Sequence, residues 1–241
     1  MADKEGVFSI TKCLSGSREN ARQVREEISS EMWEHLNMLF HEVTSSELHP
    51  DDDAGAMRVV KIVREGAYRF YGITDTTINH GEGWPFVQLG KYIERACNLS
   101  LLIDAYFSVE KNADDLDWVG LLSSCAAFEA YCKACAAELK PERIADFILL
   151  QPEFPYSVRY ALDRMHHALT SISNRSLSRR TGKIERLIGR LRSAVTYVQI
   201  GEAIRGDLHQ YLAAIIDQCR DLHAGVHEVY IEYPIEVAFE S

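Results

Sequence analysis

Residues 80–107 combine charged and apolar side chains in a pattern that could build a binding site. At 3.6 residues per turn, five polar side chains in the first half of this run fall on one side of a predicted helix. Farther along the chain, the same side carries only apolar residues, whereas a solvated face would stay polar. We therefore predict that the charges lie inward, at one end of a helical bundle. The five polar residues are Gln88, Lys91, Glu94, Arg95 and Asn98, and the apolar ones are Leu101, Leu102 and Ala105.

A second charged row lies near the N-terminus, where Arg18, Arg22 and Arg25 follow one another at spacings of four and three. If the two charged ends meet, Glu94 faces these arginines in a half-buried pocket. Arginine can bind a carboxylate or phosphate through two parallel N–H bonds, and a low local dielectric strengthens the interaction. From spacing alone, the alternative of a structural ion-pair network is favoured. On a single helix the row would continue into Ser29, Met32, Leu36 and Phe40.

The same residues suggest catalytic candidates. An acid among arginines either neutralises them or acts as a base, so Glu94 is a candidate general base and His80 a candidate proton shuttle. Two glycines flank Glu82 just before a predicted helix; their amides could bind an anion, and a tight turn explains them equally well. The ligand-binding candidates are Arg18, Glu19, Asn20, Arg22, Arg25, Glu82, Trp84 and Arg95.

Metal and cofactor signatures are missing from the sequence, so we expect neither. No Glu-x-x-His pair of a di-iron bundle occurs. His223 and His227 lie one helical turn apart with only Glu228 nearby, which favours two exposed histidines over a zinc site. Cys132 and Cys135 form a single Cys-x-x-Cys, which favours packing of small residues. Nucleotide-binding glycine loops and a Gly-x-Ser-x-Gly elbow are absent too.

These candidates would be positioned by helices, because apolar residues recur at spacings of three and four along most of the chain. We predict an all-α, pseudo-symmetric bundle of about eight helices in a single domain, 1–241. Pro suits a first helical position, and Asp115 or Asp117 suits an N-cap. The predicted helices cover about 17–43, 57–79, a third opened by Trp84 and Pro85, 115–137, 141–150, 155–172, 183–199 and 207–228.

The pseudo-symmetry is predicted from a weak internal repeat. The segment from Phe8 aligns with that from Phe154, which indicates duplication. The matched pairs are Ser9 with Ser157, Ile10 with Val158 and Leu14 with Leu162.

The two ends of the chain are expected to differ from the helical body. Residues 1–7 are predicted to be disordered and 229–241 an extended tail. From Val229 to Phe239 apolar residues alternate with mostly polar ones, as in a strand. Such a strand could pair with a second copy or another protein, whereas Pro234 favours a tail lying on the helices.

Composition excludes some classes of function. The formal net charge of −10 argues against non-specific binding of nucleic acid. A local basic patch is possible at Arg175, Arg179, Arg180 and Lys183, but a solvated loop is the favoured interpretation. The sequence has no apolar run long enough to span a membrane and no secretory signal, and its six cysteines are typical of reduced thiols. We therefore expect a cytoplasmic protein.

Several long motifs, in order, resemble the alpha-E family of bacterial helical proteins, which is named for a Glu-Arg motif. That motif matches Glu94-Arg95 in "INHGEGWPFVQLGKYIERA". The likeness covers roughly 8–227 and implies an all-α fold. It also implies a genomic context beside ATP-grasp amide-bond ligases and transglutaminase-like peptidases. The other motifs are "SITKCLSGSRENARQVREEISSEMWEHLN", "RIADFILLQPEFPYSVRYAL", "RLIGRLRSAVTYVQIGEAI" and "GDLHQYLAAIIDQCRDLHAGV".

The chain also departs from the family pattern. Alpha-E proteins normally begin with a further segment that carries a first Glu-Arg helix, similar to the run Tyr92–Ala96, and this chain starts after it. Without that helix an apolar groove would be exposed. We therefore expect a homodimer or larger homo-oligomer in which a second copy covers the groove.

The leading hypothesis is an accessory protein that binds an anionic group, such as a peptide carboxylate or a phosphate, and works with an ATP-grasp amide-bond ligase. Arg18, Arg22, Arg25 and Arg95 would bind the anion and Glu94 would orient them. One alternative is an enzyme that forms or hydrolyses amide bonds, with Glu94 as general base. Another is a structural oligomer that uses its C-terminal strand.

Overall fold

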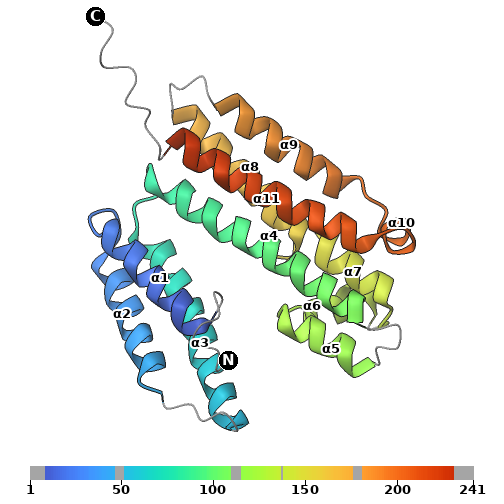
Figure 1. Ribbon diagram of the computed structural model, residues 1–241, viewed down its shortest axis with the longest axis horizontal. Helices are drawn as coiled ribbons and strands as arrows, with labels where there is room; N and C mark the ends of the chain where they lie inside the picture. The colour runs from blue at the N-terminus through green and yellow to red at the C-terminus, as the bar shows by residue number, and fades with distance from the viewer. Residues whose placement is uncertain (1–8, 47–51, 110–114, 137, 176–180, 231–241) are drawn as a thin grey trace, which may run out of the picture. The chain divides into compact units, whose positions relative to one another are not determined.

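The computed structural model describes residues 9–46, 52–109, 115–136, 138–175 and 181–230 (Figure 1). These residues form eleven α-helices and contain no strand. The all-α prediction is therefore confirmed. The chain divides into two compact units, Met1–Trp84 and Pro85–Ser241. That 1–241 forms a single domain stays a prediction.

The first unit contains three helices, α1 (Ile10–Gln23), α2 (Ser30–Thr44) and α3 (Asp53–Thr77), and α2 packs against both of the others. Leu14, Leu39, Val43 and Val59 form a small core cluster in this unit. Gly66 of α3 is where α2 and α3 approach closely, because a Cβ placed there would lie 2.5 Å from Leu39 Cδ1. The absence of a side chain at Gly66 thus lets these two helices pack.

The second unit holds most of the apolar core. Its N-terminal helices are α4 (Gly83–Val109), α5 (Asp115–Ser124), α6 (Phe128–Cys135) and α7 (Pro141–Leu150). They are followed by α8 (Val158–Arg175), α9 (Thr181–Thr196), α10 (Ile200–Arg205) and α11 (Leu208–Tyr230). Helix α9 packs against both α8 and α11. The largest buried side chains in this core include Tyr131, Ile148, Leu162, Met165 and Ile188.

The prediction of one helix over 17–43 is wrong. Helix α1 ends at Gln23, and α2 begins at Ser30 after its N-cap Ser29, whose Oγ accepts a hydrogen bond from the Met32 amide at 3.1 Å. An N-cap serine stabilises a new helix start, which the apolar spacing alone did not reveal. As a result, Arg25 lies in the connecting turn, and the predicted arginine row does not run along one helix.

Two further differences raise the number of helices above the predicted eight. The helix predicted over 115–137 is interrupted, because Ala126 has a φ of 50° and the chain restarts as α6. The short helix α10 follows α9 where the prediction had one helix to 199 and then a loop. Helix α11 includes Val229 and Tyr230, so the predicted tail begins too early. The remainder of that tail and strand, and residues 1–7, lie outside the described residues.

The two segments matched by the internal repeat begin their helices in the same way. The Oγ of Ser9 accepts a hydrogen bond from the Lys12 amide at 3.2 Å, and the Oγ of Ser157 accepts one from the Tyr160 amide at 3.0 Å. Leu14 and Leu162, five residues after these caps, are both buried. The local match is therefore structural, and pseudo-symmetry of the whole chain stays a prediction.

Candidate functional site

In the second unit, α4 and the start of α8 bring together a group of cationic and aromatic side chains. Lys91, Tyr92 and Arg95 come from α4, and their spacing places Tyr92 and Arg95 one turn apart. Tyr156 precedes α8, and two further residues follow at spacings of four. We call this group the Tyr92 cluster; it consists of Lys91, Tyr92, Arg95, Tyr156, Tyr160 and Arg164.

Three cations surround the ring of Tyr92, which is only 5% exposed. From the ring centroid, Lys91 Nζ lies at 5.0 Å, Arg95 Cζ at 5.3 Å and Arg164 Cζ at 6.0 Å. The ring of Tyr160 lies 6.0 Å away between centroids. Cations at such distances are attracted by the negative face of an aromatic ring. The cluster therefore concentrates positive charge beside a partly desolvated aromatic surface.

The environment keeps the Tyr92 hydroxyl protonated. Burial raises its pKa above the ordinary value of about 10, and the neighbouring Tyr160 raises it further. Arg164 and Arg95 act in the opposite direction, because positive charge favours the phenolate. Burial is the largest of these effects, so at neutral pH the hydroxyl remains a hydrogen-bond donor.

Arg95 is held in place by the turn that precedes α8. Its Nη1 donates to the Pro155 carbonyl at 3.0 Å, and its Cζ lies 4.2 Å from the centroid of the Tyr156 ring. The side chain of Arg164 is exposed. Among the residues that the structure describes, no carboxylate forms an ion pair with Arg95 or Arg164. The charges of these two arginines are thus not neutralised by a carboxylate of the described residues.

Glu94, the predicted base, is exposed, and its Oε1 accepts a hydrogen bond from Asn98 Nδ2 at 3.0 Å. Within the described part of the chain it forms no ion pair. His80, the predicted proton shuttle, belongs to the first unit and Glu94 to the second. Their catalytic roles stay predictions.

The arginines predicted near the N-terminus separate into two environments. Arg18 donates through Nε to Asn37 Oδ1, and Arg25 donates to the Ser30 hydroxyl at 3.2 Å. Both guanidinium groups lie over Trp33, at 5.9 and 6.0 Å from the centroid. The turn between α1 and α2 therefore brings Arg18 and Arg25 to the same aromatic ring.

Arg22, by contrast, pairs with Glu19 on the surface of α1, at 2.7 Å. The hydrogen bond from Arg22 lowers the pKa of the Glu19 carboxyl. Both side chains are about half exposed or more, and Asn20 is also exposed. Exposed pairs of this kind contribute little to stability. Glu19 and Arg22 thus form a surface ion pair, whereas Arg18 and Arg25 lie at the Trp33 ring.

The predicted residues around the start of α4 form a compact turn. The rings of His80 and Trp84 stack at 3.9 Å between centroids, with 11° between their planes. His80 Nε2 donates to the Asp75 carbonyl at 3.0 Å, because a carbonyl can only accept. Glu82 is exposed. These contacts support the alternative in which the glycines here serve a tight turn.

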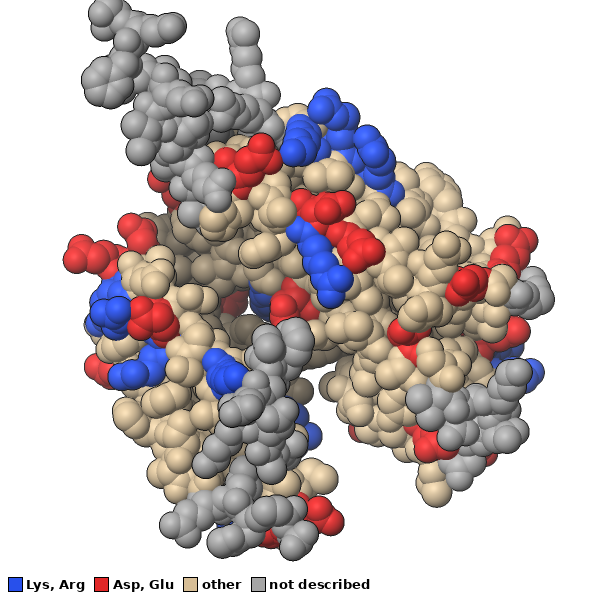
Figure 2. All heavy atoms as spheres, viewed as in Figure 1, with Lys and Arg blue, Asp and Glu red and all other residues tan. Residues whose placement is uncertain are grey.

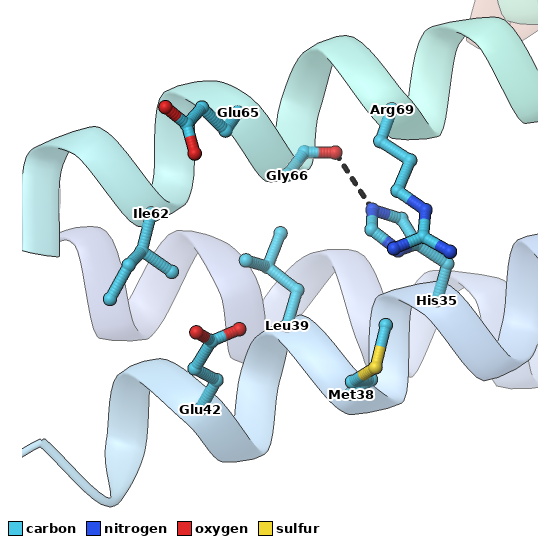
Figure 3. Close-up of a pocket in the computed structure, with 8 residues that line it drawn as sticks. All are labelled: His35, Met38, Leu39, Glu42, Ile62, Glu65, Gly66 and Arg69. Atoms are coloured by element: carbon cyan, nitrogen blue, oxygen red, sulfur yellow. Dashed lines mark hydrogen bonds between the residues drawn. The ribbon is translucent and has the colours of Figure 1, made fainter.

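Sequence reasoning missed a pocket of about 280 Å³ between α2 and α3. Figure 3 shows the carboxylates of Glu42 and Glu65 on one side of Leu39, and Arg69 beside His35 on the other. His35 is buried, and its Nε2 donates to the Gly66 carbonyl at 2.8 Å. Helical spacing places the lining residues of each helix on one face, but it gives no sign that the two faces meet around one hollow. The remaining lining residues are Met38, Ile62 and Gly66.

It also missed part of the Tyr92 cluster: Tyr156, Tyr160 and Arg164. The available signal was their spacing of four, which places three side chains of aromatic or cationic type on one side of a helix start. Spacing could not indicate that this side faces α4, because that contact depends on how two helices distant in sequence pack.

The metal candidates do not assemble. In the described part of the chain, no three His, Cys, Asp or Glu side chains are placed to hold a metal ion. His223 and His227 are exposed on α11, and Cys132 and Cys135 are free thiols of α6. Lys183 of the predicted basic patch pairs with Glu228 at 3.0 Å. The side chains of the other three patch residues are not described.

Two features of the molecule bear on its environment. No helix in the described ranges is long and apolar enough to cross a bilayer. On the face drawn in Figure 2, most of the surface is neither acidic nor basic, and Lys and Arg side chains form small separate groups with Asp and Glu near them. That face therefore lacks the single broad basic area that binds nucleic acid non-specifically.

Comparison with known proteins gives a family match over most of the chain. The model of the family Alpha-E, described as a predicted alpha-helical domain with a conserved ER motif, matches residues 1–231. An uncharacterized protein of Mycobacterium bovis is 24% identical over 231 residues, covering 91% of this chain and 26% of its own length. Uncharacterized proteins of two Mycobacterium tuberculosis strains are 24% and 23% identical with the same coverage. The chain thus spans about a quarter of the length of these curated relatives. No solved structure matches it.

Proposed function

We propose that this chain, which belongs to the Alpha-E family, is an accessory helical protein that binds an anionic group at the Tyr92 cluster. The observation that supports the proposal is the arrangement of three cations around one buried tyrosine ring. Neither Arg95 nor Arg164 is paired with a carboxylate of the described chain. Grouped cations repel one another, and a bound anion would relieve that repulsion.

The chemistry of the cluster favours a carboxylate or a phosphate as the bound group. Arg164 is exposed, and its planar guanidinium can offer two parallel N–H bonds to two oxygens of one anion. Lys91 adds a compact charge, and the protonated Tyr92 hydroxyl could donate a further hydrogen bond. Arg95 is held by the Pro155 carbonyl. It therefore contributes positive charge to the cluster rather than a side chain that extends to the ligand. Glu94-Arg95 is also the pair that resembles the Glu-Arg motif of the family.

The resemblance to the family supports two wider proposals. The anionic group would belong to the substrate or product of an ATP-grasp amide-bond ligase, with which this protein works. The protein would also assemble into a homodimer or larger homo-oligomer. Light scattering on the purified chain tests the second: a mass of 27.4 kDa, that of one copy, would contradict it.

The binding proposal is tested by thermal unfolding in the presence of a panel of anions. The panel contains inorganic phosphate, pyrophosphate, acetate and short acidic peptides. A ligand that binds only the folded state raises the unfolding midpoint, so at least one anion should raise that of the wild type. Arg164→Gln should abolish the rise. Arg190→Gln is the matched control, because Arg190 is an exposed arginine of α9 in the same unit.

Two results would contradict the proposal: no anion shifts the wild type, or Arg164→Gln and Arg190→Gln reduce the shift equally. The second result would mean that the anion-induced shift depends on the net charge of the protein rather than on the Tyr92 cluster. Glu94→Gln separates binding from catalysis. If Glu94 were a general base, this variant would keep the anion-induced shift and lose turnover with a ligase substrate.

A further inference from the structure

Helices α4 and α11 run antiparallel and side by side within the second unit (Figure 1). At one end, the rings of Phe86 and Tyr230 meet edge to face, with 5.4 Å between centroids. Toward the other end, His209 Nδ1 lies 2.8 and 2.9 Å from the two carboxylate oxygens of Asp104. These contacts fix the register of the two helices.

That register places two cysteines opposite each other. Cys97 lies eleven residues after Phe86 (97 − 86), and Cys219 lies eleven residues before Tyr230 (230 − 219). Eleven residues make about three helical turns, so each cysteine lies on the same side of its helix as its aromatic reference residue. The register thus brings the two thiols near each other, and each thiol alters the pKa of the other.

The two sulfurs differ in access and in acidity. Cys97 is half-buried, whereas Cys219 is completely buried. The hydrogen bond from Cys219 lowers the pKa of the Cys97 thiol, and nearby Arg220 adds to this, against the effects of burial and of Glu94. The pKa of Cys219 is raised by the same hydrogen bond and by burial. Cys97 is therefore the thiol that an oxidant reaches and that more readily becomes a nucleophilic thiolate.

We propose that Cys97 and Cys219 form a peroxide-sensitive dithiol that closes to a disulfide between α4 and α11. The Cys97 thiolate attacks one oxygen of a peroxide; the O–O bond breaks, hydroxide or alkoxide leaves, and Cys97 becomes a sulfenic acid. The sulfur of Cys219 then attacks the sulfur of Cys97, the S–O bond breaks, and water leaves. The two thiols lose two electrons and two protons in total, and the peroxide is reduced by two electrons.

The other four cysteines provide internal comparisons. Burial raises the pKa of Cys125 to about 12, which disfavours its thiolate. The pKa of Cys135 is also raised by burial, and its helix neighbour Cys132 is a free thiol of intermediate exposure. Cys13 is exposed in the first unit. Exposure alone would select Cys13 for oxidation, whereas the proposal selects the pair Cys97 and Cys219.

The test is to expose the purified full chain to hydrogen peroxide and map its disulfides by mass spectrometry. We expect a loss of two hydrogen atoms from one chain, a cross-linked peptide pair containing Cys97 and Cys219, and full reversal by dithiothreitol. Cys219→Ala should instead accumulate a sulfenic acid at Cys97, which dimedone traps. Cys132→Ser is the matched control and should form the disulfide as the wild type does.

Two outcomes would overturn the proposal. One is oxidation of Cys13 or Cys132 while Cys97 stays reduced. The other is a disulfide within one chain that joins any other pair, such as Cys132 with Cys135. The wild-type map needs no substitution, so it gives an answer even if Cys219→Ala does not fold.

Discussion

At the scale of single residues, Arg95 and Arg164 have different roles in the Tyr92 cluster. Arg95 is tied to the Pro155 carbonyl and stacked on Tyr156, so it joins α4 to the turn before α8. Arg164 shares the Tyr92 ring but has an exposed side chain that can reach a ligand. Substitution of Arg164 therefore tests binding with less disturbance of the fold than substitution of Arg95.

A second residue pair predicts how stability depends on pH. The hydrogen bond to Asp104, followed by the charges of Asp104 and Asp207, raises the pKa of His209 above its ordinary value of about 6.5. A raised folded-state pKa means that protonated His209 stabilises the fold. That contribution is complete below about pH 6.5 and is lost as the pH rises through the folded-state pKa. Asp104→Asn removes it.

The measurement is the unfolding midpoint of wild type and Asp104→Asn over about pH 5 to 9. The variant should unfold at a lower temperature at acidic pH, and the difference should shrink as the pH rises. Asp217→Asn is the control, because Asp217 pairs with an arginine, Arg220, at 3.1 Å. A difference between wild type and Asp104→Asn that stays constant with pH would contradict the assigned role of His209.

The sequence could predict part of this chemistry residue by residue. It identified Lys91 and Arg95 as charged positions on one side of a helix that is otherwise largely apolar. It could not identify Arg164 or Tyr160, because helical spacing within one segment carries no information about which distant segment packs against it. It also grouped Arg22 with Arg18, although Glu19 lies closer along α1 and pairs with Arg22.

At the scale of helices, the presence of a helix was easier to predict than the residues at which it begins and ends. Pro141 marks the start of α7, and both this start and the end at Leu150 were predicted correctly. The break between α1 and α2 was missed, because the apolar stripe keeps its spacing across the turn while Ser29 caps the new helix. The break between α5 and α6 was also missed. It occurs at Ala126, whose φ is positive, and alanine gives no indication of such a conformation in the sequence.

The packing of α2 on α3 gives a prediction at this scale. Gly66→Ala would place a methyl group 2.5 Å from Leu39 Cδ1, so the buried Leu39 side chain or the helices themselves must shift. We expect the free energy of unfolding to fall by about 1–3 kcal/mol. Gly72→Ala, on the same helix with nothing within 4 Å, should raise it by about 0.5–1 kcal/mol.

Urea unfolding followed by circular dichroism measures both variants. A Gly66→Ala protein as stable as Gly72→Ala would contradict the predicted close packing of α2 and α3. It would show that the two helices do not approach closely at Gly66.

At the scale of the whole molecule, the two units differ in how much apolar surface they bury. Among the described residues, the core cluster of the first unit is small, whereas that of the second is far larger. Regions with few buried apolar contacts open more readily. Native-state hydrogen exchange should therefore show faster exchange for the amides of α1–α3 than for those of α8, α9 and α11. Equal protection in both units would contradict this.

The measurement that tests the proposed function most directly is a calorimetric titration with the anion that the unfolding panel identifies, starting with inorganic phosphate. Wild type should bind it, and Arg164→Gln should raise the Kd by about tenfold or more, equivalent to about 1.4 kcal/mol. Arg190→Gln, with the same change in net charge, should leave the Kd unchanged. No measurable binding to the wild type, or the same Kd in both variants, would contradict an anion site at the Tyr92 cluster.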